Sequence, residues 1–215
     1  MVIKEAVILC GGEGKRLRPL TDSIPKPMIL VNGRPIIDYK IAHLKKYGVE
    51  KIVVACGYKW EKIKEKYGDS LIYSVEDKPL GTGGALKNAL KHINGREFFV
   101  TNCDDMVDID LKELEKIGSN AICVSHFRSN FGLVDIEANK VVGFRQKPML
   151  PFWANIGFYL FNKNMQLPDN GSMEDETFPK IELKAFNHEG RWFTINTMKD
   201  LEEVEKELKE NPFPF

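Results

Sequence analysis

Short apolar runs, separated by glycine, proline and charged residues, recur along most of the chain. Five runs have the length and apolar content of buried strands: residues 6–9, 51–56, 71–75, 98–102 and 121–125. Between them, apolar residues recur at helical spacing in four segments: 35–47, 58–67, 85–92 and 111–117. Strands that alternate with helices are typical of a doubly wound α/β fold. We therefore expect one mostly parallel sheet with helices on both faces.

The pattern changes after residue 130. Apolar and polar residues alternate over 132–137 and 140–148 around Ala138-Asn139, which predicts an antiparallel hairpin. A further strand is expected at 153–160, a short helical stretch at 173–180 and a helix at 198–209. Thr197 and Asp200 have the spacing of a helix-capping pair, so the last helix should begin there.

Three glycines stand within four positions where the first predicted strand ends: Gly11, Gly12 and Gly14. Glycine has no Cβ, so the backbone N–H groups of such a loop can approach a phosphate. Neither common phosphate loop fits. A Walker loop needs Ser or Thr after its lysine, where this chain has Arg16, and the dinucleotide fingerprint needs a third glycine where it has Leu17.

Positive charge is concentrated near this loop, although the chain as a whole has a formal net charge of zero. Residues 13–27 contain four basic and two acidic side chains: Lys15, Arg16, Arg18, Lys26, Glu13 and Asp22. Lys26 stands between two prolines, which favour extended geometry and would hold its ammonium in place. A triphosphate and a second phosphate repel each other, so bringing them together requires fixed cations or a metal ion.

Composition narrows the class of protein. The 215 residues suit one α/β domain, and balanced charge argues against nonspecific binding to nucleic acid or membrane surfaces. No apolar run approaches the roughly 20 residues of a membrane span, and no signal-peptide pattern is present. We expect a cytoplasmic protein. The four cysteines and four histidines are dispersed, which gives little support to a zinc site or a Cys/His nucleophile.

The loop continues as Gly-Gly-x-Gly-x-Arg-Leu-x-Pro-Leu-Thr and is followed by Pro-Lys-Pro-Met at 25–28. This pattern closely resembles the signature of the sugar-1-phosphate nucleotidylyltransferases, in particular the mannose- and heptose-1-phosphate guanylyltransferases. The resemblance extends to about residue 207. It implies a Rossmann-like catalytic domain over 1–215, without the C-terminal β-helix of some relatives. It also implies transfer of a nucleoside monophosphate from an NTP to a sugar 1-phosphate, with release of pyrophosphate.

The resemblance also implies roles for individual residues. The triphosphate would lie on the first loop, at Leu9, Gly11, Gly12 and Gly14. A second glycine cluster, Leu-Gly-Thr-Gly-Gly at 80–84, resembles the loop that reads base and sugar, in a form that favours GTP. Its nucleotide-binding residues would be Gly81, Thr82 and Gly83. The alternative is a glycine-rich turn without a ligand.

The paired acids Asp104 and Asp105 follow the predicted strand 98–102. Carboxylates at the end of a central strand suit Mg²⁺, which binds carboxylate oxygens together with substrate phosphates. The resemblance assigns the metal to Asp104, with Asp105 as a helper, although Cys103 replaces the glycine of the family's Asn-Gly-Asp. Arg16 and Lys26 would neutralise the departing pyrophosphate. The reaction is then positioning and charge neutralisation, without a nucleophilic side chain or general base.

The predicted hairpin resembles the sugar-facing part of the family. Gly132 and Lys147 match, whereas Gln146 replaces a glutamate. Lys147 would bind the sugar phosphate, and Asn155, in the strand that follows, would bind sugar hydroxyls. The alternative for Lys147 is an ordinary surface lysine before a turn proline.

One departure concerns the metal. The family has Trp-x-Asp-x-Gly-Thr near its end, and this chain has Thr194 in place of that aspartate. Either Asp104, waters and phosphates hold the metal, or the protein is a non-catalytic nucleotide- or NDP-sugar-binding regulator. Another alternative is transfer of the nucleotide to phosphocholine or to molybdopterin. Molybdopterin is disfavoured because the enzymes that act on it carry their lysine much nearer the glycine loop than Lys26 is here. The base, the sugar and the oligomeric state stay open, with a homo-oligomer among the options.

Overall fold

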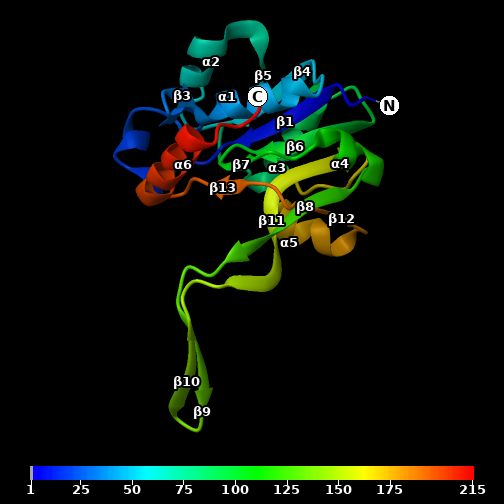
Figure 1. Cartoon of the computed structure of the whole chain (residues 1–215). Coiled ribbons are helices and arrows are strands. Elements are labelled where there is room, and N and C mark those ends of the chain that lie inside the picture. The colour runs from blue at the N-terminus through cyan, green and yellow to red at the C-terminus, as the bar shows by residue number, and fades with distance from the viewer. Residues whose placement is uncertain (1) are drawn as a thin grey trace.

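The computed structural model describes residues 2–215, and its central feature is a seven-stranded sheet with the order β12-β8-β11-β6-β1-β4-β5 (Figure 1). The strands are β1 Glu5–Cys10, β4 Lys51–Cys56, β5 Ile72–Val75, β6 Glu97–Asn102, β8 Ala121–Arg128, β11 Met149–Asn162 and β12 Lys184–Asn187. Strand β11 is antiparallel to both of its neighbours, and the other neighbouring pairs are parallel. The predicted mostly parallel sheet is confirmed.

Three small antiparallel pairs accompany this sheet. They are β2 Leu30–Val31 with β3 Arg34–Pro35, β7 Asp105–Val107 with β13 Trp192–Thr194, and β9 Leu133–Glu137 with β10 Lys140–Arg145. The second pair matters for the site because it places Thr194 opposite Asp105. The third pair is the predicted hairpin, and it projects away from the body of the molecule (Figure 1).

The helices are α1 Ile36–Lys46, α2 Glu61–Tyr67, α3 Gly81–Ala89, α4 Leu111–Ile117, α5 Met173–Glu176 and α6 Met198–Glu210. Helix α6 begins with the predicted capping pair. The Asp200 N–H donates to the Thr197 hydroxyl at 3.3 Å, and the Thr197 N–H donates to the Asp200 carboxylate at 2.7 Å. None of the helices within residues 2–215 has both the length and the apolar content to cross a bilayer.

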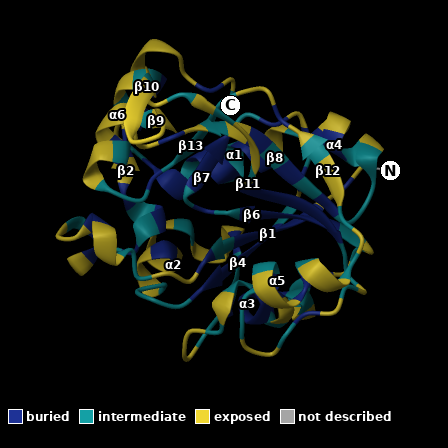
Figure 2. Ribbon diagram, turned by 90° about the horizontal axis from the view of Figure 1, so that it is seen from below, coloured by how far each residue is buried: buried dark blue, intermediate teal, exposed yellow. Residues whose placement is uncertain are grey.

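The core lies on both faces of the sheet, because successive strand residues point to opposite sides. On one face, Ile8 packs in a cluster with buried residues of α1, α4 and α6. On the other, its neighbour Val7 packs with residues of α3 and α5. Complete burial of such a side chain contributes roughly 1.5–3 kcal/mol. The buried strands run through the centre of Figure 2, so the ends of β1 and β6 are held rigidly.

Two helices begin elsewhere than the pattern predicts. Helix α2 begins at Glu61 rather than Tyr58, because Lys59 has a positive φ of 51° that a helix does not accommodate. Helix α3 begins at Gly81 rather than Ala85, so the second glycine cluster is the first turn of the helix and not a loop before it.

Candidate active site

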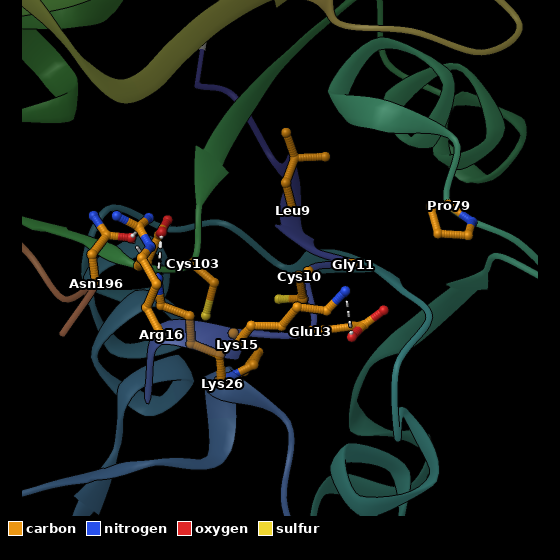
Figure 3. Close-up of a pocket in the computed structure, with 14 residues that line it drawn as sticks. Leu9, Cys10, Gly11, Glu13, Lys15, Arg16, Lys26, Pro79, Cys103 and Asn196 are labelled. Carbon is orange, nitrogen blue, oxygen red and sulfur yellow. Dashed lines mark hydrogen bonds and ion pairs between the residues drawn. The ribbon is translucent and has the colours of Figure 1, made fainter. Parts of the chain in front are cut away.

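A cavity of about 500 Å³ lies where β1 and β6 end (Figure 3). These parallel strands are neighbours, with Leu9 opposite Asn102, so the loops that follow them meet at one edge of the sheet. Seven of the predicted site residues line this cavity: Leu9, Gly11, Gly12, Gly14, Arg16, Lys26 and Asp104. The structure thus brings together the residues assigned to the triphosphate, the metal and the leaving group.

Gly14 gives the loop its shape. Its φ is 64°, and a Cβ there would lie 2.9 Å from Thr21 Cγ2 and 3.2 Å from Lys26 Cβ. Its carbonyl accepts hydrogen bonds from the Leu17 N–H at 2.9 Å and the Thr21 hydroxyl at 3.0 Å. Gly12 has no atom within 4 Å of its Cβ position, so its backbone faces open space. A ligand can therefore approach the loop at Gly12, while Gly14 holds the turn against Lys26.

Lys26 is the central cation of the cavity. Its side chain is only 13% exposed, and its ammonium lies 2.7 Å from Asp104 Oδ2 and 3.1 Å from Asn196 Oδ1. The expected extended geometry is wrong, because Lys26 begins a three-residue 3₁₀ turn while only Pro25 is extended. The Lys26 ammonium is nonetheless held in place. Its contacts with Asp104 and Asn196 connect three segments that are distant in the sequence.

Asn196 is a site residue that the sequence reasoning missed. Its Oδ1 accepts from Lys26 and, at 2.9 Å, from the Arg16 guanidinium (Figure 3). Its Nδ2 donates to the Thr194 hydroxyl at 2.8 Å. Thr194 thereby orients the amide so that its oxygen faces the cavity. The sequence did contain a signal for it. Asn196 has a side-chain oxygen and stands where the family pattern Trp-x-Asp-x-Gly-Thr has its glycine, two positions after Thr194.

Asp105 does not face the cavity beside Asp104. It is buried, and its carboxylate accepts from the Trp192 indole at 3.0 Å and the Asn102 amide at 3.2 Å. Burial, together with the charge of Asp104, raises the pKa of Asp105. The buried Lys40 ammonium donates to the Asp105 backbone carbonyl, and burial lowers the pKa of Lys40. These contacts anchor the turn that presents Asp104.

Two buried thiols form the floor of the cavity. Cys103, which replaces the family's glycine, donates its backbone N–H to the Leu9 carbonyl at 3.1 Å. Burial, followed by the neighbouring Cys103 thiol, raises the pKa of Cys10 well above its usual value. The Cys10 thiol is therefore a neutral, apolar packing group rather than a nucleophile.

The second glycine cluster does not line the cavity. A Cβ on Gly83 would lie 2.6 Å from Pro168 Cγ, so the glycine permits α3 to pack closely against residues 168–171. The Thr82 hydroxyl donates to Glu174 and accepts the Met173 N–H at 3.0 Å. Close packing accounts for these residues in the free protein, and the nucleotide-binding role of Gly81, Thr82 and Gly83 stays a prediction.

The three residues predicted for the sugar phosphate also lie outside the cavity. Gly132 and Lys147 are at the base of the projecting hairpin, and both are exposed. The Asn155 amide donates to the Tyr159 hydroxyl at 2.7 Å and accepts the Gly157 N–H at 3.0 Å. The structure therefore does not bring the predicted acceptor residues together with the glycine loop.

A smaller cavity of about 270 Å³ adjoins the first and shares Gly11, Glu13 and Pro79 with it. Glu76 lines this second cavity, directly after β5. Its Oε2 accepts the Leu80 N–H at 2.8 Å, and burial raises its pKa. A Cβ on Gly11 would lie 2.5 Å from Glu76 Oε1, so the glycine makes room for this carboxylate. Sequence reasoning also missed Glu76, whose only signal was its place at the end of a strand.

The architecture and the motifs agree with known proteins. The sequence model of the nucleotidyl transferase family matches residues 5–210 of this chain. A D-glycero-alpha-D-manno-heptose 1-phosphate guanylyltransferase of Campylobacter jejuni is 34% identical over 214 residues, which cover 91% of this chain and 96% of that protein. A mannose-1-phosphate guanyltransferase of Aspergillus fumigatus is 34% identical over 226 residues, covering 91% of this chain and 62% of the longer relative.

Solved structures show the same fold. HddC from Yersinia pseudotuberculosis, complexed with GMP-PN, has a TM-score of 0.76 and 27% identity, covering 96% of this chain and 100% of that one. UDP-glucose pyrophosphorylase complexed with UDP-glucose has a TM-score of 0.73 at 17% identity, covering 97% and 99%, which is a likeness of fold alone. With the family match over nearly its whole length, the chain belongs to the nucleotidyl transferase family.

Proposed function

We propose that the protein transfers guanosine monophosphate from GTP to a sugar 1-phosphate, giving a GDP-sugar and pyrophosphate. The observation that carries this proposal is the convergence of Lys26, Arg16 and Asn196 with Asp104 beside the glycine loop. Relatives described as heptose- and mannose-1-phosphate guanylyltransferases, at 34% identity, support the substrate class.

The cavity suits an in-line displacement at the α-phosphate. The attacking sugar phosphate oxygen is already anionic near neutral pH, so no general base is needed. Backbone N–H groups of Gly11, Gly12 and Gly14 would hold the triphosphate. Lys26 and Arg16 would then neutralise the negative charge that develops on the leaving pyrophosphate, the kind of electrostatic stabilisation that dominates phosphoryl transfer.

The oxygens beside Lys26 also fit Mg²⁺. Asp104 Oδ2 and Asn196 Oδ1 already converge on one cation, the Lys26 ammonium. A carboxylate and an amide oxygen are ligands that Mg²⁺ accepts, with waters and substrate phosphates completing its coordination. Within residues 2–215, no three His, Cys, Asp or Glu side chains form a metal cluster, so the nucleotide would supply the other ligands. Mg²⁺ would shield the phosphate charges, and Asn196 would take the place of the aspartate replaced by Thr194.

Glu76 would select guanine. The Watson–Crick edge of guanine carries two adjacent donors, N1–H and the N2 amine, which one carboxylate can accept together. The other bases present at least one acceptor in the corresponding position, which a carboxylate repels. Glu76 lines the cavity that adjoins the glycine loop, and its Oε1 lies beside Gly11, so it would be within reach of a nucleotide whose triphosphate lies on that loop. Replacement of Glu76 by Gln should therefore lower kcat/KM for GTP much more than that for ATP.

The remaining assignments need movement or contacts that the free protein lacks. Gly81, Thr82 and Gly83 would contact the nucleotide from the start of α3. On the acceptor side, Lys147 would bind the sugar phosphate, with Gly132 allowing close approach and Asn155 binding sugar hydroxyls. These residues lie outside the first cavity in the free protein, so their roles require closure of the acceptor side over bound nucleotide.

A matrix assay tests the function. Each of the four NTPs is combined with a set of hexose and heptose 1-phosphates, with Mg²⁺, and release of pyrophosphate is measured. We expect turnover with GTP and one or a few sugar phosphates. Binding of GTP, measured by calorimetry, without pyrophosphate release from any pair would overturn the proposal in favour of a non-catalytic regulator.

A further inference from the structure

Helix α1 carries a lysine on the side that packs into the core. Lys40 is only 2% exposed, and the other buried residues of this helix include Ile36, Ile37 and Leu44 of the apolar core. A lysine is almost never buried unless its ammonium is paired, because removal of the charge from water is unfavourable. An apolar residue would fill the same space without this penalty, so the value of Lys40 lies in what its ammonium contacts.

The ammonium bridges the two sides of the turn that carries Asp104. Strand β6 ends at Asn102 and β7 begins at Asp105, so Asp104 lies at the tip of the turn between them. Lys40 Nζ donates to the Thr101 hydroxyl at 3.1 Å, before the turn, and to the Asp105 carbonyl, after it. One buried cation therefore closes the base of the turn.

The same turn is also held by β13 and the residue that follows it. The Ile195 N–H donates to the Asp104 carbonyl at 3.1 Å, and the Trp192 indole donates to the Asp105 carboxylate at 3.0 Å. The Asp104 side chain, by contrast, is 32% exposed and lines the larger cavity. The backbone of the turn is thus fixed from α1 and from β13, while the Asp104 carboxylate is presented to a ligand.

Lys40 acts on Asp104 by position rather than by charge. Burial lowers the pKa of Lys40, and the nearby charge of Asp105 opposes that shift. The buried ammonium and the buried Asp105 carboxylate offset each other, so together they add little net field at the cavity. Loss of Lys40 would instead remove the hydrogen bonds at the base of the turn and leave the Asp105 carbonyl without that donor.

The position of Asp104 matters because Thr194 stands where the family pattern has a second aspartate, so a metal ion would meet one carboxylate here rather than two. Ligands of a metal must be held within about 0.5 Å of their productive geometry. We propose that Lys40 is a positioning residue for metal binding, which fixes the turn so that the Asp104 carboxylate and the Asn196 amide oxygen converge on the same Mg²⁺. This inference rests on the proposed metal site and not on the transfer step.

Binding of Mn²⁺ tests the proposal without turnover. Lys40→Met removes the ammonium and keeps a side chain of similar length. In the presence of GTP, the dissociation constant for Mn²⁺, measured by electron paramagnetic resonance, should rise about tenfold or more. The affinity for GTP in EDTA, measured by calorimetry, should stay as in the wild type, since the glycine loop is unchanged. Lys45→Met, the same change at an exposed lysine of α1, is the matched control and should alter neither constant.

A second variant keeps the test decisive if Lys40→Met does not fold. Thr101→Val is nearly isosteric and removes the hydroxyl that accepts from Lys40, while the contact of Lys40 with the Asp105 carbonyl stays. The Mn²⁺ dissociation constant should rise by a smaller factor, about three- to tenfold, because one of the two contacts remains. Near-UV circular dichroism shows whether each variant is folded.

The outcomes separate positioning from stability. An unchanged Mn²⁺ affinity in folded Lys40→Met, or in Thr101→Val where Lys40→Met is unfolded, would overturn the proposal and leave Lys40 a role in stability alone. Equal weakening of Mn²⁺ binding and of metal-free GTP binding would also overturn it, since the whole cavity would then be distorted. If the wild type binds GTP and Mn²⁺ but releases no pyrophosphate, the proposed transfer fails, and the effect of Lys40→Met on Mn²⁺ affinity still decides this inference.

Discussion

The two halves of the proposed site are built in different ways. At the nucleotide end, the glycine loop, Lys26, Asp104 and Asn196 belong to segments far apart in the sequence, yet direct contacts join them. At the acceptor end, Gly132 and Lys147 lie at the base of a hairpin whose strands pair only with each other. The motif resemblance assigns both ends to one site. Contacts within the chain hold only the nucleotide end in place.

The difference has a physical origin. Loops at the ends of β1 and β6 are positioned by the register of a buried sheet, so their approach to each other is determined when the core forms. The hairpin has no such support, because its strands pair only with each other and its large apolar side chains are exposed. A preformed nucleotide end and an adjustable acceptor end suit an enzyme that binds the nucleotide first.

The largest loss of turnover should come from substitutions that remove a charge at the nucleotide end. Lys26→Ala and Asp104→Asn should each reduce turnover by at least about a hundredfold, since each removes one fixed electrostatic stabiliser. Pyrophosphate release under saturating substrates measures this. Lys62→Ala, at a 52% exposed lysine of α2, is the control and should be as active as the wild type. Near-normal turnover of either variant would show that the cavity is not where the chemistry occurs.

The next effect concerns Asn196, the least expected member of this end. Asn196→Ala should raise the Mg²⁺ concentration needed for half-maximal activity by about ten- to hundredfold, because an oxygen near the metal is lost. Binding of Mn²⁺ in the presence of GTP, followed by electron paramagnetic resonance, measures the affinity without turnover. The control is Asn211→Ala, at the exposed end of α6. An unchanged Mn²⁺ affinity would mean that Asn196 does not bind the metal and only orients the side chains of Lys26 and Arg16.

A smaller effect is expected at the acceptor end. Lys147→Ala should raise KM for the sugar phosphate about tenfold, the scale of one charged hydrogen bond, and leave KM for GTP unchanged. Lys140→Ala removes the same charge at the far end of the hairpin and should change neither constant. Equal KM values for Lys147→Ala and the wild type would remove the hairpin base from the acceptor site.

The smallest effect should follow from a change on the charged face of the hairpin. Asp135→Asn removes an ion pair whose side chains are 52% and 58% exposed, so the free energy of unfolding should fall by less than about 1 kcal/mol. Urea denaturation measures it, with turnover as a second readout that should not change. A larger loss of stability would mean that the hairpin is coupled to the body more strongly than its contacts indicate.

Much of the fold could be read from local pattern. The apolar runs that became β1, β4 and β6, and the capping pair Thr197 and Asp200, depend on residues close together in the sequence, and each was predicted near its observed position. The start of α3 was predicted wrongly, because the pattern does not show that Gly83 packs against Pro168, more than eighty residues away.

The sequence by itself determined the main alternation of strands and helices and the position of the glycine loop, because backbone propensity and glycine's lack of a Cβ act locally. It did not predict the sheet strand β12 or the short strands β7 and β13. Only the tertiary structure decided that Asn196 meets Lys26 and Arg16, that Asp105 faces the core rather than the cavity, and that the hairpin stands apart. These outcomes depend on which distant segments come into contact when the core packs, and no single stretch of sequence contains that information.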